Sequence, residues 1–215
     1  MRNGGRGALL LVLTAGAPAA AQRITIGPEF AVAESREASS GLRFSGVGPG
    51  AEATLVWRRF SADAAVCSLD MTPTSGSAAV SSFRATEIDA WVAWEALNYL
   101  SFEAGVTNRT PDAEFAAQSL GAVRVGVRTH YLLGPGATIW LRGDYLAGAQ
   151  FSGGGTAPLA LELSLGLDLA LSRHLHAAAS YAFQRFDRST NPGGLPQTSV
   201  PMEQSLARIG LALGF

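Results

Sequence analysis

Apolar residues alternate with polar or small residues through most of this chain, most regularly over Pro158–Ser172. Leucine occupies every odd position from 159 to 171, and the even positions carry Ala, Glu, Ser, Gly, Asp, Ala and Ser. Residues two apart on a helix are turned by about 200°, so these leucines would share no helical face. On a strand they form one continuous apolar stripe, although leucine is not a favoured strand residue. The pattern therefore predicts a strand.

The same alternation predicts nine further strands and so an all-β chain of about ten strands. In the clearest segments every charged residue falls on the parity opposite to the apolar residues. The nine segments are Ile24–Glu34, Ala51–Trp57 (or from near Leu42), Phe60–Met71, Thr86–Ala96, Leu100–Arg109, Leu120–Leu133, Ala137–Gln150, His176–Phe186 and Met202–Phe215. Pro49 within Gly46–Gly50 fits a strand badly and predicts a loop there. Eight strands are therefore an alternative.

Three features favour a membrane barrel over a soluble two-sheet sandwich. The predicted strands are about 10–14 residues long, longer than the usual five or six and sufficient to cross a bilayer on a tilt. Aromatic residues gather near strand ends, and short connections alternate with longer ones, as periplasmic turns alternate with surface loops. The aromatics are Trp57, Tyr99, Tyr131 and Phe215 at one end, and Phe30, Tyr145, Tyr181 and Phe183 nearer the other.

Residues 1–21 have the pattern of a secretory signal peptide. Arg2 and Arg6 precede a short apolar core, and Ala19–Ala21 offers a small-residue cleavage site. The alternative is a buried N-terminal helix. Cleavage would leave one domain, residues 22–215, which contains 14 of the 16 basic residues and all 17 acidic residues. This charge balance does not suggest nucleic acid as a partner.

The lone cysteine, Cys67, excludes an intramolecular disulfide and lies far from the cleavage point, where a lipoprotein would need its cysteine. We expect it to fill the interior as a small side chain. No uncharged apolar run of 18 residues follows the leader, so the sequence predicts no transmembrane helix.

The segment Ser205–Phe215 ends the chain with apolar residues at steps of two. Together with the leader and the alternation, it makes the chain resemble small outer-membrane β-barrel proteins of Gram-negative-type bacteria, in no specific subfamily. The resemblance implies a single antiparallel up-and-down transmembrane barrel in the cell outer membrane, in contact with its lipid and lipopolysaccharide. It also implies an assembly signal for the barrel assembly machinery, formed by Ile209, Leu211, Leu213 and Phe215.

Charged residues on the lumen parity predict an ion network. Barrels of about eight strands are filled by side chains, whereas 16–18 strands leave a channel, so ten strands suggest a filled or narrow lumen. Counting through the turns places Arg128 and Arg142 near one level, with Glu103 and Asp168 close to it. We predict a network of Glu103, Arg128, Arg142 and Asp168, with Arg124, Glu162 and Arg208 nearby. It would close the barrel or, alternatively, line a narrow ion path.

No catalytic, cofactor or metal site is expected from the sequence. His130, His174 and His176 fall at the end away from the surface loops, so an outer-membrane protease or lipid A deacylase is not favoured. Arg185 and Arg188 could contact lipopolysaccharide phosphates or be ordinary charges at a strand end. We therefore expect a non-enzymatic, structural or membrane-integrity role. A small porin-like pore and a secreted soluble barrel that binds an apolar ligand are the alternatives.

Overall fold

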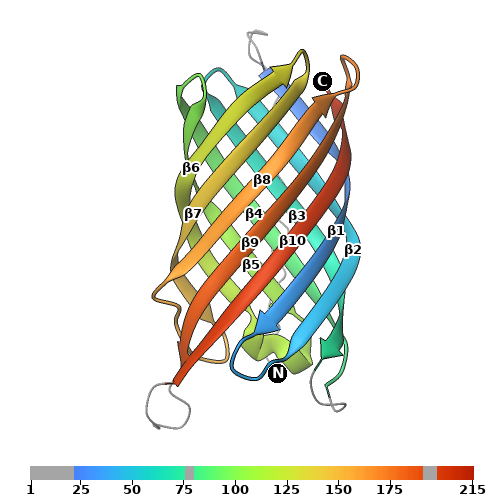
Figure 1. Cartoon of the computed structure of the whole chain (residues 1–215). Coiled ribbons are helices and arrows are strands. Elements are labelled where there is room, and N and C mark those ends of the chain that lie inside the picture. The colour runs from blue at the N-terminus through green and yellow to red at the C-terminus, as the bar shows by residue number, and fades with distance from the viewer. Residues whose placement is uncertain (1–21, 76–79, 191–197) are drawn as a thin grey trace, which may run out of the picture.

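A computed structural model describes residues 22–75, 80–190 and 198–215, which form one closed antiparallel barrel (Figure 1). The predicted signal peptide lies outside the described residues. A short 3₁₀ helix, η1 (Ala113–Gln118), accompanies the strands. The strands are β1 (Gln22–Glu37), β2 (Arg43–Trp57), β3 (Phe60–Ser75), β4 (Phe83–Leu97), β5 (Leu100–Pro111), β6 (Leu120–Gly134), β7 (Ala137–Phe151), β8 (Ala160–Ala170), β9 (Leu175–Thr190) and β10 (Thr198–Gly214).

Each strand pairs with its neighbours in sequence, and β1 pairs with β10 to close the barrel. The closure runs the length of both strands, with Phe30 opposite Ile209. At its end the Phe215 amide donates to the Ile24 carbonyl at 2.9 Å. The ten-stranded, up-and-down barrel predicted from the alternation is confirmed, and the eight-stranded alternative is wrong.

The two ends of the barrel differ in their connections. At one end, the short-turn end, four tight turns join β2 to β3, β4 to β5, β6 to β7 and β8 to β9. The start of β1 and the end of β10 lie at this end too, at the top of Figure 1. The other connections, including η1, lie at the opposite end, the long-loop end (Figure 1).

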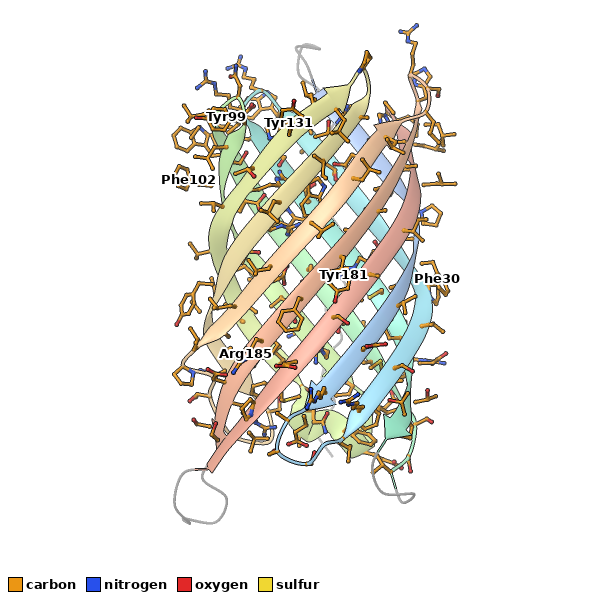
Figure 2. All side chains as sticks on the ribbon, in the orientation of Figure 1. Phe30, Tyr99, Phe102, Tyr131, Tyr181 and Arg185 are labelled. Atoms are coloured by element: carbon orange, nitrogen blue, oxygen red, sulfur yellow. The ribbon has the colours of Figure 1, made fainter. Side chains whose placement is uncertain are left out.

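The barrel turns its apolar side chains outward. The leucines at positions 159, 161, 163, 165 and 171 are exposed, Leu163 by 62%. Figure 2 shows labelled aromatic side chains such as Phe30, Phe102 and Tyr181 projecting from the outer surface. Charged residues of the opposite parity are buried inside, with Arg124 only 3% exposed. None of the helical residues described forms a helix long and apolar enough to cross a membrane.

The loop predicted over Gly46–Gly50 is wrong, because β2 runs through it without interruption. Pro49 points outward and pairs with Phe30 of β1, while the described ladder with β3 passes from Val47 to Gly50 without a pair at Pro49. Proline has no backbone N–H to donate, and this is tolerated here because the β2–β3 ladder is interrupted at Pro49. Gly48 is needed for close approach, since a Cβ there would lie 1.7 Å from the Ser68 carbonyl oxygen.

A bulge at Gly148 changes which side chains of β7 point inward. Gly148 has a φ of 63°, and the register with β6 shifts between Gly121 and Val123. The extra residue places both Leu146 and Ala149 inside the barrel, although they differ in parity. The inward position of Phe151 follows from the same shift.

Candidate functional site

The lumen is the candidate site, and its half nearest the long-loop end is filled by apolar side chains. We call this filling the apolar layer; its larger members are Phe44, Leu69, Met71, Leu120, Leu146, Phe151, Phe186, Met202 and Leu206. Phe151 and Phe186 meet edge to face at 6.0 Å between ring centroids. Phe115 of η1 stacks on Phe83 at 4.3 Å and so covers this layer from the loops.

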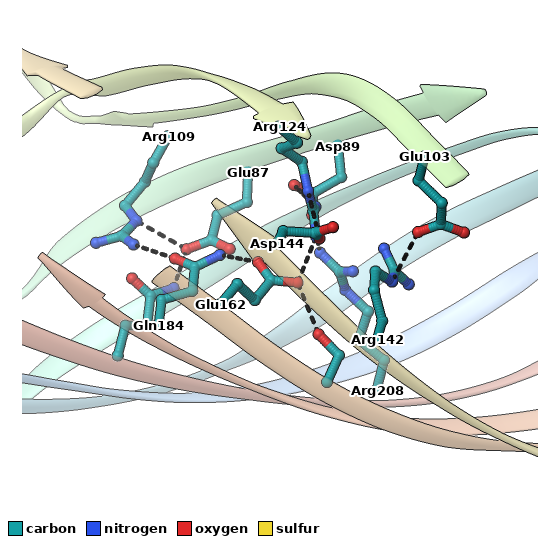
Figure 3. Close-up of polar contacts among 12 residues, drawn as sticks. Glu87, Asp89, Glu103, Arg109, Arg124, Arg142, Asp144, Glu162, Gln184 and Arg208 are labelled. Atoms are coloured by element: carbon teal, nitrogen blue, oxygen red, sulfur yellow. Dashed lines mark hydrogen bonds and ion pairs between the residues drawn. The ribbon is translucent and has the colours of Figure 1, made fainter. Parts of the chain in front are cut away.

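On the short-turn side of the apolar layer, five arginines and six carboxylates form ion pairs across the lumen, and we call this set the ionic layer. Figure 3 shows most of its members. They come from seven of the ten strands. The members are Glu29, Glu87, Asp89, Glu103, Arg109, Arg124, Arg128, Arg142, Asp144, Glu162 and Arg208. Because strands far apart in sequence are joined, the layer ties opposite walls of the barrel together.

Arg124 is the centre of the ionic layer. Its guanidinium lies 3.0 Å from Asp89 and 2.8 Å from Asp144, and it also pairs with Glu162. Two nitrogens, Nε and Nη2, donate to the same Asp144 oxygen. The planar fork of arginine makes several such contacts at once, which an ammonium group on lysine cannot reproduce.

Glu103 joins Arg128 and Arg142, as predicted. The Arg128 Nε lies 2.8 Å from one carboxylate oxygen and the Arg142 Nε lies 3.4 Å from the other. The Arg142 guanidinium also lies over the Trp91 ring at 4.4 Å and the Trp140 ring at 5.0 Å. Contacts with these two aromatic rings hold the cation in place in addition to its carboxylate partner.

Polar side chains extend the ionic layer toward the apolar layer. Arg109 pairs with Glu87 at 2.9 Å, and Gln204 donates to the same carboxylate. Gln184 donates to Glu162 at 2.7 Å and accepts from Arg109. On the opposite wall Arg208 lies 2.6 Å from Asp89. Such connected groups polarise one another, so we expect the layer to act as a unit.

The inclusion of Asp168 in this network is wrong. Arg128 is opposite Arg142, and Arg142 is opposite Ser164, whereas Asp168 is opposite Thr138, four residues nearer the short-turn end. Asp168 forms no ion pair with any described residue and is exposed in the mouth of the lumen. The carboxylate that β8 contributes to the ionic layer is Glu162.

Between the ionic layer and the short-turn end lies a polar cavity of about 450 Å³. Its floor includes Trp91, Arg128 and Arg142, and its walls include Glu52 and Asp168. A second, much smaller space of about 20 Å³ lies among Asp89, Arg124 and Glu162 of the ionic layer. The lumen is therefore open at the short-turn end, narrow at the ionic layer and filled beyond it.

The histidines lie at the short-turn end, as the sequence predicts. The His174 ring nitrogen Nδ1 lies 3.1 Å from the Gly214 carbonyl oxygen, and His176 lines the polar cavity. Among the described residues no histidine pairs with a carboxylate, and no group of His, Cys, Asp or Glu side chains could hold a metal ion. Cys67 is buried in the apolar layer.

The two arginines near the long-loop end have partners within the chain. Arg185, which points outward in Figure 2, lies 3.2 Å from Asp187 and 3.8 Å from Glu203. Arg188 donates to the Gly154 carbonyl at 2.8 Å and lies 4.5 Å from the Phe151 ring centroid. Local carboxylates and a backbone carbonyl already occupy both groups, which weakens the hypothesis that they bind lipopolysaccharide phosphates.

The residues of the predicted assembly signal project from the outer surface of β10. Ile209, Leu211 and Leu213 are each more than half exposed, and Phe215 is 75% exposed. Their alternation with the buried Ala212 and Gly210 places all four on the apolar exterior. The geometry is that of a terminal strand with one apolar face.

Comparison with known proteins identifies the fold. No protein-family model and no curated protein matches the chain. The outer membrane protease OmpT of Escherichia coli matches with a TM-score of 0.53 at 10% identity, over 90% of this chain and 96% of that one. The fold is that of an outer-membrane β-barrel protein. Because the identity is low, the likeness of this barrel to OmpT concerns the fold alone.

Two further outer-membrane barrels also match. Neisserial surface protein A matches with a TM-score of 0.45 at 13% identity, over 89% of this chain and 97% of that one. The attachment invasion locus protein Ail of Yersinia pestis matches with a TM-score of 0.43 at 10% identity, over 90% and 98%.

Reasoning from sequence missed two parts of the lumen of this barrel. The predicted network leaves out several members of the ionic layer, because strand counting does not show how far arginine reaches. They are Glu29, Glu87, Asp89, Arg109 and Asp144. The alternation and the strand count predict a filled or narrow lumen with Cys67 inside it, but they do not predict a separate apolar layer. Its signal was present in apolar residues on the lumen parity near the loops, such as Leu146, Phe186 and Leu206.

Proposed function

We propose that this chain is an integral outer-membrane protein whose sealed lumen gives it a structural role in membrane integrity. The observation that supports this most is the succession of two fillings, the ionic layer and the apolar layer, across a barrel with an apolar exterior. Ions would have to cross both. A barrel sealed in this way adds a rigid, tightly closed element to the bilayer without making it leaky.

The orientation follows from the connections. Outer-membrane barrels have short periplasmic turns and longer extracellular loops, so the short-turn end would face the periplasm. The exterior would contact lipid along most of its height and lipopolysaccharide near the long-loop end. Ile209, Leu211, Leu213 and Phe215 would be available to the barrel assembly machinery before β10 pairs with β1.

A small pore is the second candidate, and the polar cavity is the observation that favours it. The cavity opens the lumen from the short-turn end as far as the ionic layer. For ions to pass, the side chains of both the ionic layer and the apolar layer would have to move aside. A secreted soluble barrel is disfavoured, because an exterior of exposed leucine, valine and aromatic side chains would meet water over a large area.

Replacing Leu165 by arginine tests whether the exterior meets lipid. Leu165 lies near the middle of β8 and is 52% exposed. In a bilayer we expect Leu165→Arg to lower the free energy of unfolding by about 2–4 kcal/mol, the effect of a cation at the midplane. Urea unfolding in lipid vesicles, followed by tryptophan fluorescence, measures it.

Leu171→Arg is the matched control. Leu171 is equally apolar and 56% exposed but lies beyond the end of β8, at the short-turn end. There the effect should fall to about 0–1 kcal/mol. Equal stability of the Leu165→Arg protein and the parent protein in vesicles would contradict a lipid-facing exterior.

A further inference from the structure

Four aromatic side chains form a row across the outer surface near the short-turn end. Trp57 pairs in register with Phe60, Phe60 with Trp94, and Trp94 with Phe102, on the adjacent strands β2 to β5. The rings of Trp57 and Phe60 stack at 6.3 Å, and those of Trp94 and Phe102 at 6.2 Å. All four are about half exposed. We call Trp57, Phe60, Trp94 and Phe102 the aromatic row.

Two adjacent arginines stand at the end of this row. Arg58 and Arg59 form the turn between β2 and β3, and both are exposed. The Arg58 guanidinium lies 5.4 Å from the Trp57 ring centroid. Neither arginine forms an ion pair with any described residue. The nearby Glu95 is on the lumen parity, and its backbone amide donates to the Arg59 carbonyl.

The backbone conformation at Arg58 indicates that arginine occupies this position for a functional reason. Arg58 has a φ of 55°, a left-handed conformation that no other non-glycine residue in the described ranges adopts. Glycine or asparagine would adopt it at lower cost. Strained positions that keep an unfavourable residue are candidates for function.

The opposite side of the barrel lacks this combination. At the corresponding level, the registered residues of β8, β9 and β10 are Leu169, Ala177 and Leu211. Arg173, in the turn between β8 and β9, is also exposed but lies between Leu171 and Leu175. Figure 2 shows Tyr99, Phe102 and Tyr131 together at the short-turn end, so further aromatic residues lie beside the row.

We propose that Arg58, Arg59 and the aromatic row bind an anionic phospholipid of the periplasmic leaflet. The guanidinium groups would hold the headgroup phosphate, which arginine contacts in two-point geometry, and the acyl chains would lie along the four rings. The inference rests on the proposed membrane location. A second copy of the chain fits less well, because a symmetric contact through this row would bring the unpaired arginines of two molecules together.

Quenching by brominated lipids tests the site in the purified, reconstituted protein. Trp57 and Trp94 report from the row, whereas Trp91 and Trp140 face the lumen and give a background independent of lipid. Brominated phosphatidylglycerol should associate with the row roughly fivefold more strongly than brominated phosphatidylcholine. In the Arg58→Gln/Arg59→Gln protein this preference should fall to about one, whereas Arg173→Gln should retain it.

The outcomes separate this site from the membrane location. Equal quenching by both lipids in the parent protein, or a preference kept by the double variant, would overturn the lipid site while leaving the barrel in the membrane. Absence of quenching by either lipid in protein that does not float with vesicles would overturn the proposed function itself. Weak quenching in floating protein of dimeric mass would assign the row to a second copy and overturn the lipid site.

Discussion

Replacing Arg124 by glutamine should lower the free energy of unfolding of the barrel by about 3–5 kcal/mol, because it leaves buried carboxylates without their cation. Asp89, Asp144 and Glu162 all pair with Arg124, and each is almost completely buried. The intact ionic layer need not be more stabilising than an apolar filling of the same volume. Removal of its central cation is nevertheless costly, since the buried Asp144 and Glu162 would lose their only arginine partner among the described residues and Asp89 would keep Arg208 alone.

Unfolding by urea in lipid vesicles measures this loss. Arg185→Gln is the matched control, because Arg185 also pairs with two carboxylates but lies on the exposed outer surface. We expect its unfolding midpoint to stay close to that of the parent protein. The unfolding midpoint of Arg124→Lys should lie between those of Arg124→Gln and the parent protein, since lysine keeps the charge and loses the planar fork. Equal midpoints for Arg124→Gln and the parent protein would show that the ionic layer does not hold the barrel together.

Replacing Phe186 by alanine should lower the free energy of unfolding by a similar amount, about 3–5 kcal/mol. Phe186 is 1% exposed and is the largest fully buried side chain described, packed against Phe151 within the apolar layer. Its removal would leave a cavity that the surrounding strands cannot collapse to fill, because the closed barrel fixes their spacing.

Phe183→Ala provides the comparison for the same experiment. Phe183 belongs to the same strand but is 38% exposed and points outward. Its replacement removes lipid contacts and creates no internal cavity, so its loss of stability should be clearly smaller. Equal losses for Phe183→Ala and Phe186→Ala would contradict a closely packed apolar layer inside the barrel.

Most of the barrel could be predicted from sequence because one physical rule governs it. A side chain on a strand faces either the exterior or the lumen, so the leucines of β8 and the charged residues between them define both surfaces. The rule fails where local backbone geometry changes the parity or tolerates an unfavourable residue. Gly148 changes the parity of β7, and Pro49 lies within β2 at an interruption of the ladder.

The candidate site could be predicted only in part, for reasons of register and reach. The common level of Arg128 and Arg142 follows from counting through the tight turn between β6 and β7, and Glu103 lies close to that level on the neighbouring strand β5. The position of Asp168 depends on the register of β7 with β8, which counting did not give correctly. The central role of Arg124 depends on a side chain long enough to reach β4, β7 and β8 together, which no pattern along a single strand reveals.

Electrical conductance across a planar bilayer tests the sealed lumen most directly. The purified protein would first be shown to float with lipid vesicles, so that a silent bilayer cannot be attributed to protein that failed to insert. With the ionic and apolar layers in place, we predict no current steps above those of the lipid alone. Discrete, reproducible steps that change in ion selectivity on replacement of Arg128 or Arg142 would contradict the account and establish the small pore.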